Sequence, residues 1–148
     1  MQLKHIMTEY VEVIAPEISI EEAAKQMRSL NVGVLPVCNG SRLVGMLTDR
    51  DVTIRAVAEG RDPKITTVEE VMTSEVAYYF EDQETEEAEQ VMEKSQIRRL
   101  SVLNREKLLV GIVSLGDFAT KDDVNRAGRT LERVSEPSRW ALSEPCIY

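Results

Sequence analysis

The feature that most constrains the fold of this chain is an internal repeat. The dipeptide Met-Thr at 7–8 recurs at 72–73, and the two halves then align without a gap over 31 positions, of which 9 are identical. One residue is inserted in the second half, after which the stretch at 43–51 (LVGMLTDRD) matches the stretch at 109–117 (LVGIVSLGD). A repeat of this length is one supersecondary unit copied twice, and such a unit buries its apolar face against its neighbour.

The periodicity within each copy predicts a strand, a helix, two strands and a second helix. In the first copy, Ser19 and Glu22 form a capping box ahead of apolar residues at helical spacing. The apolar stretches 34–38 and 42–47 are separated by Asn-Gly at 39–40, which is a strong hairpin signal. The prediction is therefore an α/β fold made of two β-α-β-β-α repeats.

The repeat divides the chain into four parts. We expect the first copy at 1–60, a linker at 61–70 and the second copy at 71–120, followed at 121–148 by a helix and an irregular tail. Two prolines and a loss of periodicity mark the tail, which favours a loosely ordered end. The two copies are expected to pack with pseudo-two-fold symmetry.

The composition restricts the function classes. A net charge of −8 argues against a nucleic-acid partner, because phosphate-backbone binding requires a basic face. No apolar run is long enough to span a membrane, and the first residues lack a secretory signal, so we expect a cytoplasmic protein. Cys38 and Cys146 have no metal-ligand spacing, and the single histidine, His5, has no catalytic partner at a recognisable distance in sequence. Neither a metal site nor catalysis is predicted.

A hydroxyl and a carboxyl recur where the third strand of each copy ends. They are Thr48 and Asp51 in the first copy, and Ser114 and Asp117 in the second. One interpretation is structural, because a hydroxyl three residues before a carboxyl is the layout of a helix capping box. The other is functional: a helix start and its hydroxyl attract phosphate, and the carboxylate accepts from ribose hydroxyls.

A glycine precedes each of these pairs by three residues in the strand. Gly45 and Gly111 are matched by the repeat. A glycine inside a strand often marks the close approach of another backbone or of a ligand. The sequence leaves both explanations open.

Together these motifs resemble a tandem pair of cystathionine-β-synthase (CBS) domains, often called a Bateman module. The first copy carries the resemblance in IMTEYV, SIEEAAKQM, NVGVLPV and LVGMLTDRD, and the second in VMTSEV, ETEEAEQVM, QIRRLSV and LVGIVSLGD. No single motif is diagnostic, but their order, spacing and duplication are highly specific. The resemblance covers about residues 3–120.

The resemblance implies a non-catalytic regulatory module. Such modules bind an adenine nucleotide or a related adenosyl ligand, here AMP, ADP, ATP or S-adenosylmethionine, in two clefts between the paired domains, and require no cofactor. It implies that Thr48 and Asp51 contact phosphate and ribose in one cleft, and that Ser114 and Asp117 do so in the other. The residues expected to line the base pockets are Val13, Ile14, Val32 and Val34 in the first copy, and Tyr78, Tyr79, Ile97 and Arg99 in the second.

The second copy departs from the family pattern around its base pocket. Tyr78 and Tyr79 either fill that pocket or pack as an aromatic strand in the core. Glu81 would repel a phosphate, whereas Arg98 and Arg99 would attract one. The alternative for the two arginines is an exposed strand edge guarded by charge.

Self-association is expected from the helices. Those near 20–31 and 85–95 carry apolar stripes that one small core does not fully bury, which favours a homodimer. Two other functions stay open: a structural or interaction homodimer without a ligand, and a regulatory subunit of a separate, unidentified enzyme. Stabilisation by a ligand distinguishes the first, and co-purification the second.

Overall fold

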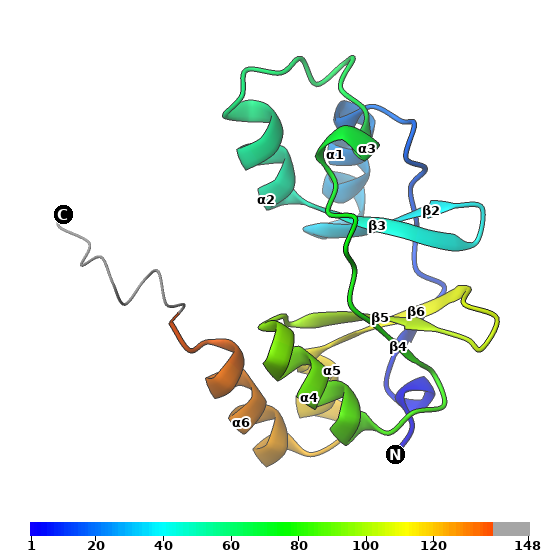
Figure 1. Cartoon of the computed structure of the whole chain (residues 1–148), viewed down its shortest axis with the longest axis vertical. Helices are drawn as coiled ribbons and strands as arrows, with labels where there is room; N and C mark the ends of the chain where they lie inside the picture. Colours follow the sequence, from blue (N-terminus) through cyan, green and yellow to red (C-terminus); the bar gives the residue numbers. More distant parts are fainter. Residues whose placement is uncertain (138–148) are drawn as a thin grey trace, which may run out of the picture.

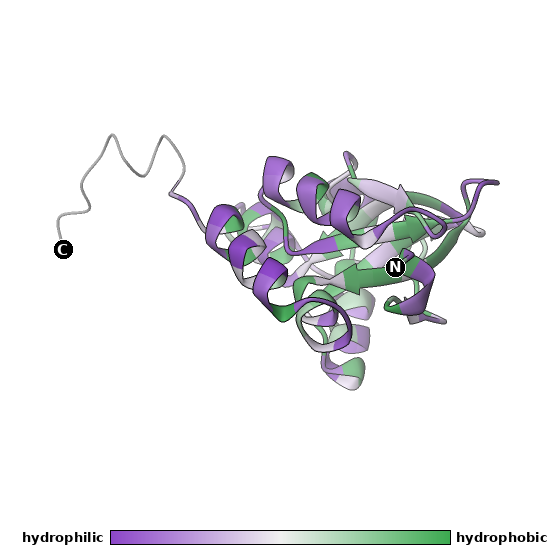
Figure 2. Ribbon diagram, turned by 90° about the horizontal axis from the view of Figure 1, so that it is seen from below, coloured by the Kyte–Doolittle hydropathy of each residue, from purple (hydrophilic) through white to green (hydrophobic). Residues whose placement is uncertain are grey.

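In the computed structural model, which describes residues 1–137, the two repeats are stacked with their strands facing each other and their helices outside (Figure 1). Figure 2 shows that hydrophobic residues concentrate in the strands between the helical layers, while the outer helices are mostly hydrophilic. The α/β class predicted from the repeat is confirmed. The part of the expected tail at 138–148 lies outside the described residues.

The elements of each repeat follow the predicted order. The chain begins with a 3-10 helix (Leu3–His5) and β1 (Thr8–Glu9). The first repeat then contains α1 (Ile20–Leu30), β2 (Val34–Asn39), β3 (Arg42–Thr48), α2 (Asp49–Val52), a π-helical turn (Thr53–Val57) and α3 (Val68–Val71). The second contains β4 (Tyr78–Phe80), α4 (Thr85–Ser95), β5 (Arg99–Leu103), β6 (Leu109–Ser114), α5 (Leu115–Lys121) and α6 (Val124–Val134).

The strands form two sheets. β2 and β3 pair as an antiparallel hairpin, and the other sheet has the order β1-β6-β5-β4. The predicted first strand of the first copy is reduced to one parallel bridge between Ile14 and Val37. Pro16 follows two residues later and has no N–H to continue the pairing.

The two hydrophobic cores do not follow the order of the chain. Leu3 and Ile6 stand at the start of the first copy but pack in the core of the second repeat. Val68 of the expected linker and Val71 at the start of the second copy are fully buried in the core of the first repeat. The segment expected as a linker at 61–70 therefore supplies part of a core. Each repeat is completed by the leading segment of the other, so the two units are intertwined.

The crossing segments explain the duplicated strand glycines. A Cβ atom added to Gly45 would lie 2.9 Å from the carbonyl oxygen of Thr73, and one added to Gly111 would lie 2.8 Å from that of Thr8. β1 pairs with β6 at this point, and Met46 makes the matching bridge to Thr73. Of the two explanations left open by the sequence, the close approach of another backbone is the one observed.

A cation at matching positions fastens each crossing segment. Arg55 Nη1 donates to the carbonyl of Val71 at 3.2 Å, and Lys121 Nζ donates to the carbonyl of Ile6 at 3.1 Å. Both carbonyls lie one residue before the repeated Met-Thr dipeptide. The pseudo-symmetry thus extends from the strands to individual side-chain contacts.

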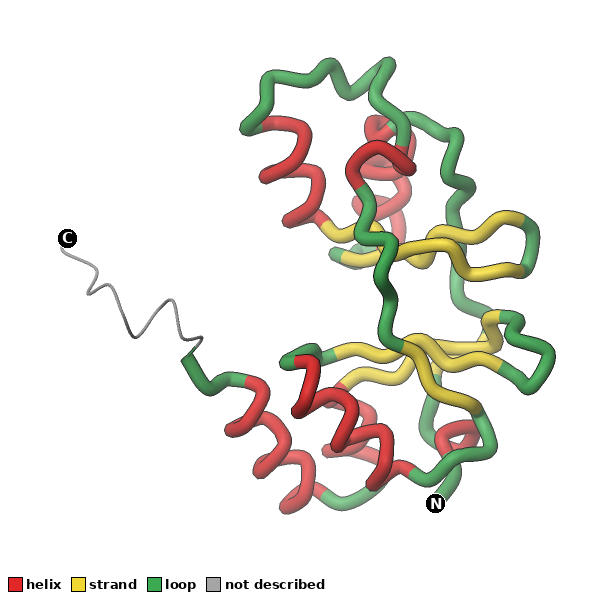
Figure 3. Tube along the Cα trace, in the orientation of Figure 1, coloured by secondary structure: helices red, strands yellow, loops and turns green. Residues whose placement is uncertain are grey.

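The last helix distinguishes the second repeat from the first. The chain turns at Asp122, and α6 folds back along α4 and α5, as the tube in Figure 3 shows. Arg126 pairs with the buried Glu89 of α4, and Glu93 accepts from Arg133 at 2.7 Å and from Thr130 at 3.0 Å. The helix at 85–95, expected to offer an apolar stripe for dimerisation, is therefore covered by its own chain.

Candidate functional site

A cleft of about 680 Å³ opens between the two repeats. Its walls come from the ends of β2 and β3, from the crossing segment that precedes β4, and from the start of β5. The residues that carry chemistry or shape there are Val34, Met46, Thr48, Asp49, Arg50, Thr73, Glu75, Ile97, Arg98, Arg99 and Ile112. Because both repeats contribute, a bound molecule would hold them together.

The predicted hydroxyl–carboxylate pair of the first repeat forms a capping box at one wall. The Thr48 N–H donates to the Asp51 carboxylate at 3.0 Å, and the Asp51 N–H donates to Thr48 Oγ1 at 3.0 Å. Thr73 Oγ1, from the crossing segment, is a second donor to Asp51 at 3.3 Å. A carboxylate has about four acceptor positions, so Asp51 keeps acceptor capacity for a ligand. Thr48 lines the cleft, and Asp51 lies behind it.

In the equivalent pair of the second repeat, the carboxylate makes more contacts within the protein. The Asp117 carboxylate accepts from the Ser114 N–H at 2.7 Å and from its hydroxyl at 2.9 Å. Lys121 Nζ adds an ion pair at 3.0 Å, and the Asp117 side chain is only 15% exposed. Neither Ser114 nor Asp117 lines the cleft described above. Both pairs form the capping box that the structural interpretation predicts. Only the pair of the first repeat has a member, Thr48, in the lining of the cleft.

Three arginines give the cleft its positive character. Arg50 follows Thr48 on the first repeat, while Arg98 and Arg99 stand at the start of β5. Within residues 1–137 none of the three makes an ion pair. The acidic residues of the lining are Asp49 and Glu75. The lining therefore carries one net positive charge, and Arg98 Nη2 also donates to the Ser135 hydroxyl at 3.4 Å.

An apolar wall lies beside the charged one. Val34 and Met46 come from the first repeat, and Ile97 and Ile112 come from the second. By the repeat, Met46 is the counterpart of Ile112. The apolar wall therefore takes residues from both repeats.

The structure groups the predicted residues differently from the sequence. Thr48 shares its cleft with Ile97, Arg98 and Arg99, which were expected in the other cleft, and with Val34. The reason is the crossing of the two repeats, which places the end of β3 opposite the start of β5. Residues from one copy alone do not build a site.

The other predicted lining residues lie elsewhere. Ile14 is buried in the first core, because neighbouring residues of an extended segment point to opposite sides. Val32 lies in a groove between α1 and α2 on the outside of the first repeat. Tyr78 lines a small hollow near the hairpin turns, and Tyr79 donates its hydroxyl to Glu87 at 3.1 Å. The two tyrosines therefore do not fill the cleft.

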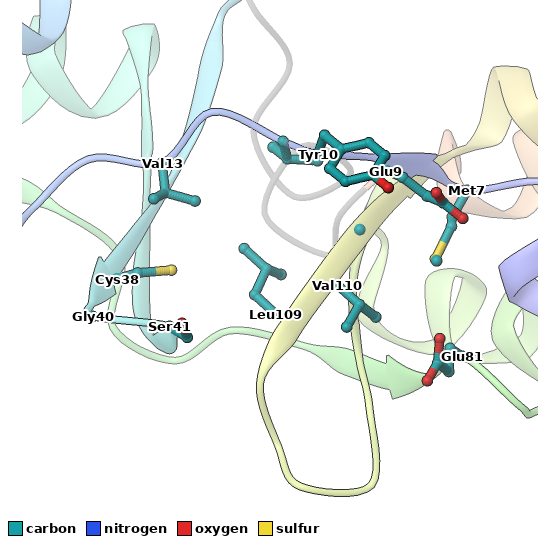
Figure 4. Close-up of a pocket in the computed structure, with 12 residues that line it drawn as sticks. Met7, Glu9, Tyr10, Val13, Cys38, Gly40, Ser41, Glu81, Leu109 and Val110 are labelled. Atoms are coloured by element: carbon teal, nitrogen blue, oxygen red, sulfur yellow. The ribbon is translucent and has the colours of Figure 1, made fainter.

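Val13 lines a separate hollow of about 450 Å³ at the hairpin end of the molecule (Figure 4). Leu109 and Val110 lie across from it, with Glu81 at one side. Burial raises the pKa of the Cys38 thiol in its wall, so this cysteine stays neutral. This hollow has no lysine or arginine among its lining residues.

Several cleft residues were not predicted as site residues. Arg50 lies inside the quoted motif LVGMLTDRD, and Thr73 belongs to the repeated Met-Thr dipeptide, so both were within reach of the sequence. Met46 and Glu75 also lie inside quoted motifs, LVGMLTDRD and VMTSEV, but neither motif indicates that they face the other repeat. Their position in the cleft follows from the crossing of the chain.

Among residues 1–137, no three His, Cys, Asp or Glu side chains gather in a way that would hold a metal ion. None of the helices in this range is long and apolar enough to cross a lipid bilayer.

Comparison with known proteins gives the family. The model of the CBS domain matches twice, at residues 3–57 and 68–122. The chain is 42% identical over 134 residues to the CBS domain-containing protein YhcV of Bacillus subtilis, covering 90% of this chain and 94% of that protein.

Solved structures agree with this similarity. A crystal structure of Hypoxic Response Protein I, with two coordinated zinc ions, matches at 36% identity and a TM-score of 0.74, covering 80% of this chain and 97% of that one. A hexameric CBS-CP12 protein from bloom-forming cyanobacteria matches at 27% identity and a TM-score of 0.71, covering 84% of this chain and 73% of that one. The protein belongs to the CBS-domain family and contains two CBS domains in tandem.

Proposed function

We propose that this protein is a non-catalytic regulatory module that binds an adenine nucleotide or a related adenosyl ligand between its two CBS domains. The observation that supports the proposal most strongly is the convergence of Thr48, Arg50, Arg98 and Arg99 on one cleft with an apolar wall. Guanidinium groups match phosphate oxygens in two-point hydrogen bonds, and an apolar wall accepts a base. Phosphate and base are thus both provided for.

The ribose has a partner in Asp51. Its carboxylate keeps acceptor capacity after the contacts with Thr48 and Thr73. Because Asp51 lies behind Thr48, we expect the ligand to displace the Thr73 hydroxyl, which is the longer of these two contacts. Binding would then pull on the crossing segment at 72–77, which links the two cores.

The net positive charge of the cleft lining gives an expected order of affinity for the candidate ligands. Three arginines against Asp49 and Glu75 favour a ligand with several negative charges. We therefore place ATP and ADP ahead of AMP, and all three ahead of S-adenosylmethionine, whose sulfonium group is positive. The zinc ions of Hypoxic Response Protein I are a property of that protein, and residues 1–137 here gather no equivalent set of ligands.

The ligand-binding module would act through assembly or a partner. We propose a homodimer in the cytoplasm, in line with the hexameric assembly of the CBS-CP12 relative. A regulated enzyme encoded separately is compatible with this role and would be found by co-purification. The competing function is a structural homodimer whose cleft binds nothing.

Titration calorimetry with AMP, ADP, ATP and S-adenosylmethionine tests the proposal. Arg99→Val installs the residue that the first repeat carries at Val34, and Arg129→Val on the outside of α6 is the matched control. We expect Arg99→Val to weaken ATP binding by about 10- to 100-fold, the value of a charged hydrogen bond, and the control to match the wild type. If the wild type binds none of the four at about 1 mM, the structural homodimer is correct.

A further inference from the structure

The last turn of α6 lies against the turn that leads from α4 into the ligand cleft. Three contacts join residues that are 40 positions apart in the chain: Glu86 with Arg126, Glu93 with Arg133, and Gln96 with Glu136. A constant separation means that the two helices run parallel, as they do in Figure 3. The C-terminal ends of α4 and α6 are therefore side by side.

The turn after α4 contacts both the cleft and α6. Ile97, Arg98 and Arg99 line the cleft. Gln96, directly before them, ends α4 with a left-handed backbone, and its Nε2 donates to the carbonyl of Glu136 at 3.1 Å. One short turn thus carries a wall of the cleft and a contact with the end of α6.

Arg98 is the side chain that belongs to both places. It lines the cleft, and its Nη2 donates at 3.4 Å to the hydroxyl of Ser135, the first residue after α6. The backbone at this position is held, because the carbonyl of Arg98 accepts from the Leu115 N–H at 2.9 Å. A movement of Arg98 between the cleft and α6 therefore involves only its exposed side chain.

The first repeat has no such connection. Gly33 stands at the position of Arg98, and its carbonyl accepts from the Asp49 N–H at 2.9 Å, as that of Arg98 does from Leu115. The backbone contact is thus the same in both repeats, and the side chain differs. The shared arginine occurs only in the repeat that also carries α6.

A phosphate group is the stronger of the two acceptors for Arg98. The contact with Ser135 is near the upper limit of hydrogen-bond length and ends on a neutral hydroxyl. Hydrogen bonds from a guanidinium group to phosphate are shorter, about twice as strong, and often paired. Because the guanidinium group is a rigid plane, a two-point contact with phosphate sets the direction of Nη2 and draws it away from Ser135.

We propose that a ligand in the cleft releases the last turn of α6, because a phosphate group of the ligand takes Arg98 from Ser135. This inference rests on the proposed function, and it specifies how a bound nucleotide is signalled outside the cleft. Such a coupling is reciprocal. A change that removes the contact between Arg98 and Ser135 therefore strengthens ligand binding, and one that reinforces the contact weakens it.

Titration calorimetry with ATP on two opposite substitutions at Ser135 tests the coupling. Ser135→Ala removes the acceptor and should tighten ATP binding by about 2- to 5-fold, whereas Ser135→Asp offers Arg98 an ion pair and should weaken ATP binding by about 2- to 5-fold. Both effects should vanish in an Arg98→Ala background, where only a general repulsion between Asp and ATP would persist. Asn125→Ala and Asn125→Asp, at the other end of α6, are the matched controls and should bind ATP as the wild type does.

Hydrogen exchange measures the same coupling from the side of α6. The Ser135 N–H donates to the carbonyl of Leu131 at 3.0 Å, and the Glu136 N–H donates to that of Arg133 at 3.3 Å. Saturating ATP should accelerate the exchange of these two amides in the wild type. In Arg98→Ala, saturating ATP should leave their exchange unchanged.

The outcomes separate this coupling from ligand binding itself. If the wild type binds ATP and the Ser135 variants bind it equally well, the coupling is wrong and the proposed function stands. Effects of Ser135 that persist in Arg98→Ala, or amides whose exchange ATP does not accelerate in the wild type, also overturn the coupling. A wild type that binds no ATP at about 1 mM overturns both. Because Ser135 and Asn125 are exposed, their variants should melt as the wild type does.

Discussion

The two capping corners, Thr48–Asp51 and Ser114–Asp117, have the same backbone geometry and different electrostatics. In both, the hydroxyl and the carboxylate cap the helix that follows the strand. Lys121 also neutralises Asp117. Its counterpart Arg55 reaches past Asp51 to the carbonyls of Val71 and Met72, at 3.2 and 2.8 Å.

This difference shows how a duplicated motif can divide its roles. The capping contacts are needed by both helices, so both copies retain them. Among residues 1–137 no cation forms an ion pair with the first carboxylate, and this carboxylate lies beside the cleft that carries Arg50, Arg98 and Arg99. The same residues therefore serve structure in both copies, and in our proposal they serve ligand binding in one.

The largest expected effect concerns the outer faces of the two repeats. Arg126→Ala leaves the buried Glu89 without its ion-pair partner, and stranding a buried charge costs about 3–5 kcal/mol. Arg28→Ala, at the matching face of the first repeat, removes an exposed side chain and should stay within about 0.5 kcal/mol of wild type. Urea unfolding of the two variants measures both changes. Equal losses would show that α6 does not distinguish the repeats.

A smaller and symmetrical effect is expected at the strand glycines. Gly45→Val and Gly111→Val each push a side chain into the crossing backbone at Thr73 or Thr8. Overpacking of this kind costs about 1–3 kcal/mol, and the matched geometry predicts similar losses for the two. Thermal melts give the comparison. A loss at one glycine only would mean that the two crossings are not equivalent.

The smallest effect is a pair of opposite pH dependences on α4. Burial raises the pKa of Glu89 despite its pairing with Arg126. Burial also acts to raise the pKa of Glu93, but hydrogen bonds from Arg133 and Thr130 outweigh it and lower the pKa. The stability that Glu89 contributes is thus present at pH values below its ordinary pKa, and it is lost as the pH rises through its pKa in the folded protein. The stability that Glu93 contributes is present at pH values above its ordinary pKa, and it is lost as the pH falls through its pKa in the folded protein.

The substitutions Glu89→Gln and Glu93→Gln each remove one of these two pH dependences of stability. Between about pH 3 and pH 7, the stability of the wild type relative to Glu89→Gln should fall with rising pH, and that relative to Glu93→Gln should rise. Urea unfolding at several pH values supplies both curves. Parallel curves would contradict the assigned environments of the two carboxylates.

Local features of this fold could be predicted from the sequence. The repeat, the hairpin at Asn39–Gly40 and the two capping boxes depend on residues that are close in the chain. Gly45 and Gly111 also indicate a close approach, although not whether a backbone or a ligand makes it. Patterns of this kind report which face of an element is buried, and they do so reliably when the partners are neighbours.

The composition of the cleft could not be predicted in the same way. Val68 and Leu3 each belong to the core of the other repeat, and no local pattern in the sequence indicates this. The same limit led to Thr48 being grouped with Val13 and Val32 rather than with Ile97. Which strand end faces which is a long-range property, set by the crossing of the chain.

The most direct test of the account compares Asp51→Ala with Asp117→Ala by titration calorimetry with ATP. Both variants lose a cap and should lose about 1 kcal/mol of stability. Asp51→Ala should also weaken ATP binding by about 10- to 150-fold, the value of a charged hydrogen bond of about 1.5–3 kcal/mol. Asp117→Ala should bind ATP as the wild type does, because its capping partner Ser114 does not line the cleft, whereas Thr48, the partner of Asp51, does. Equal losses of affinity in the two variants, or a loss confined to Asp117→Ala, would contradict the account.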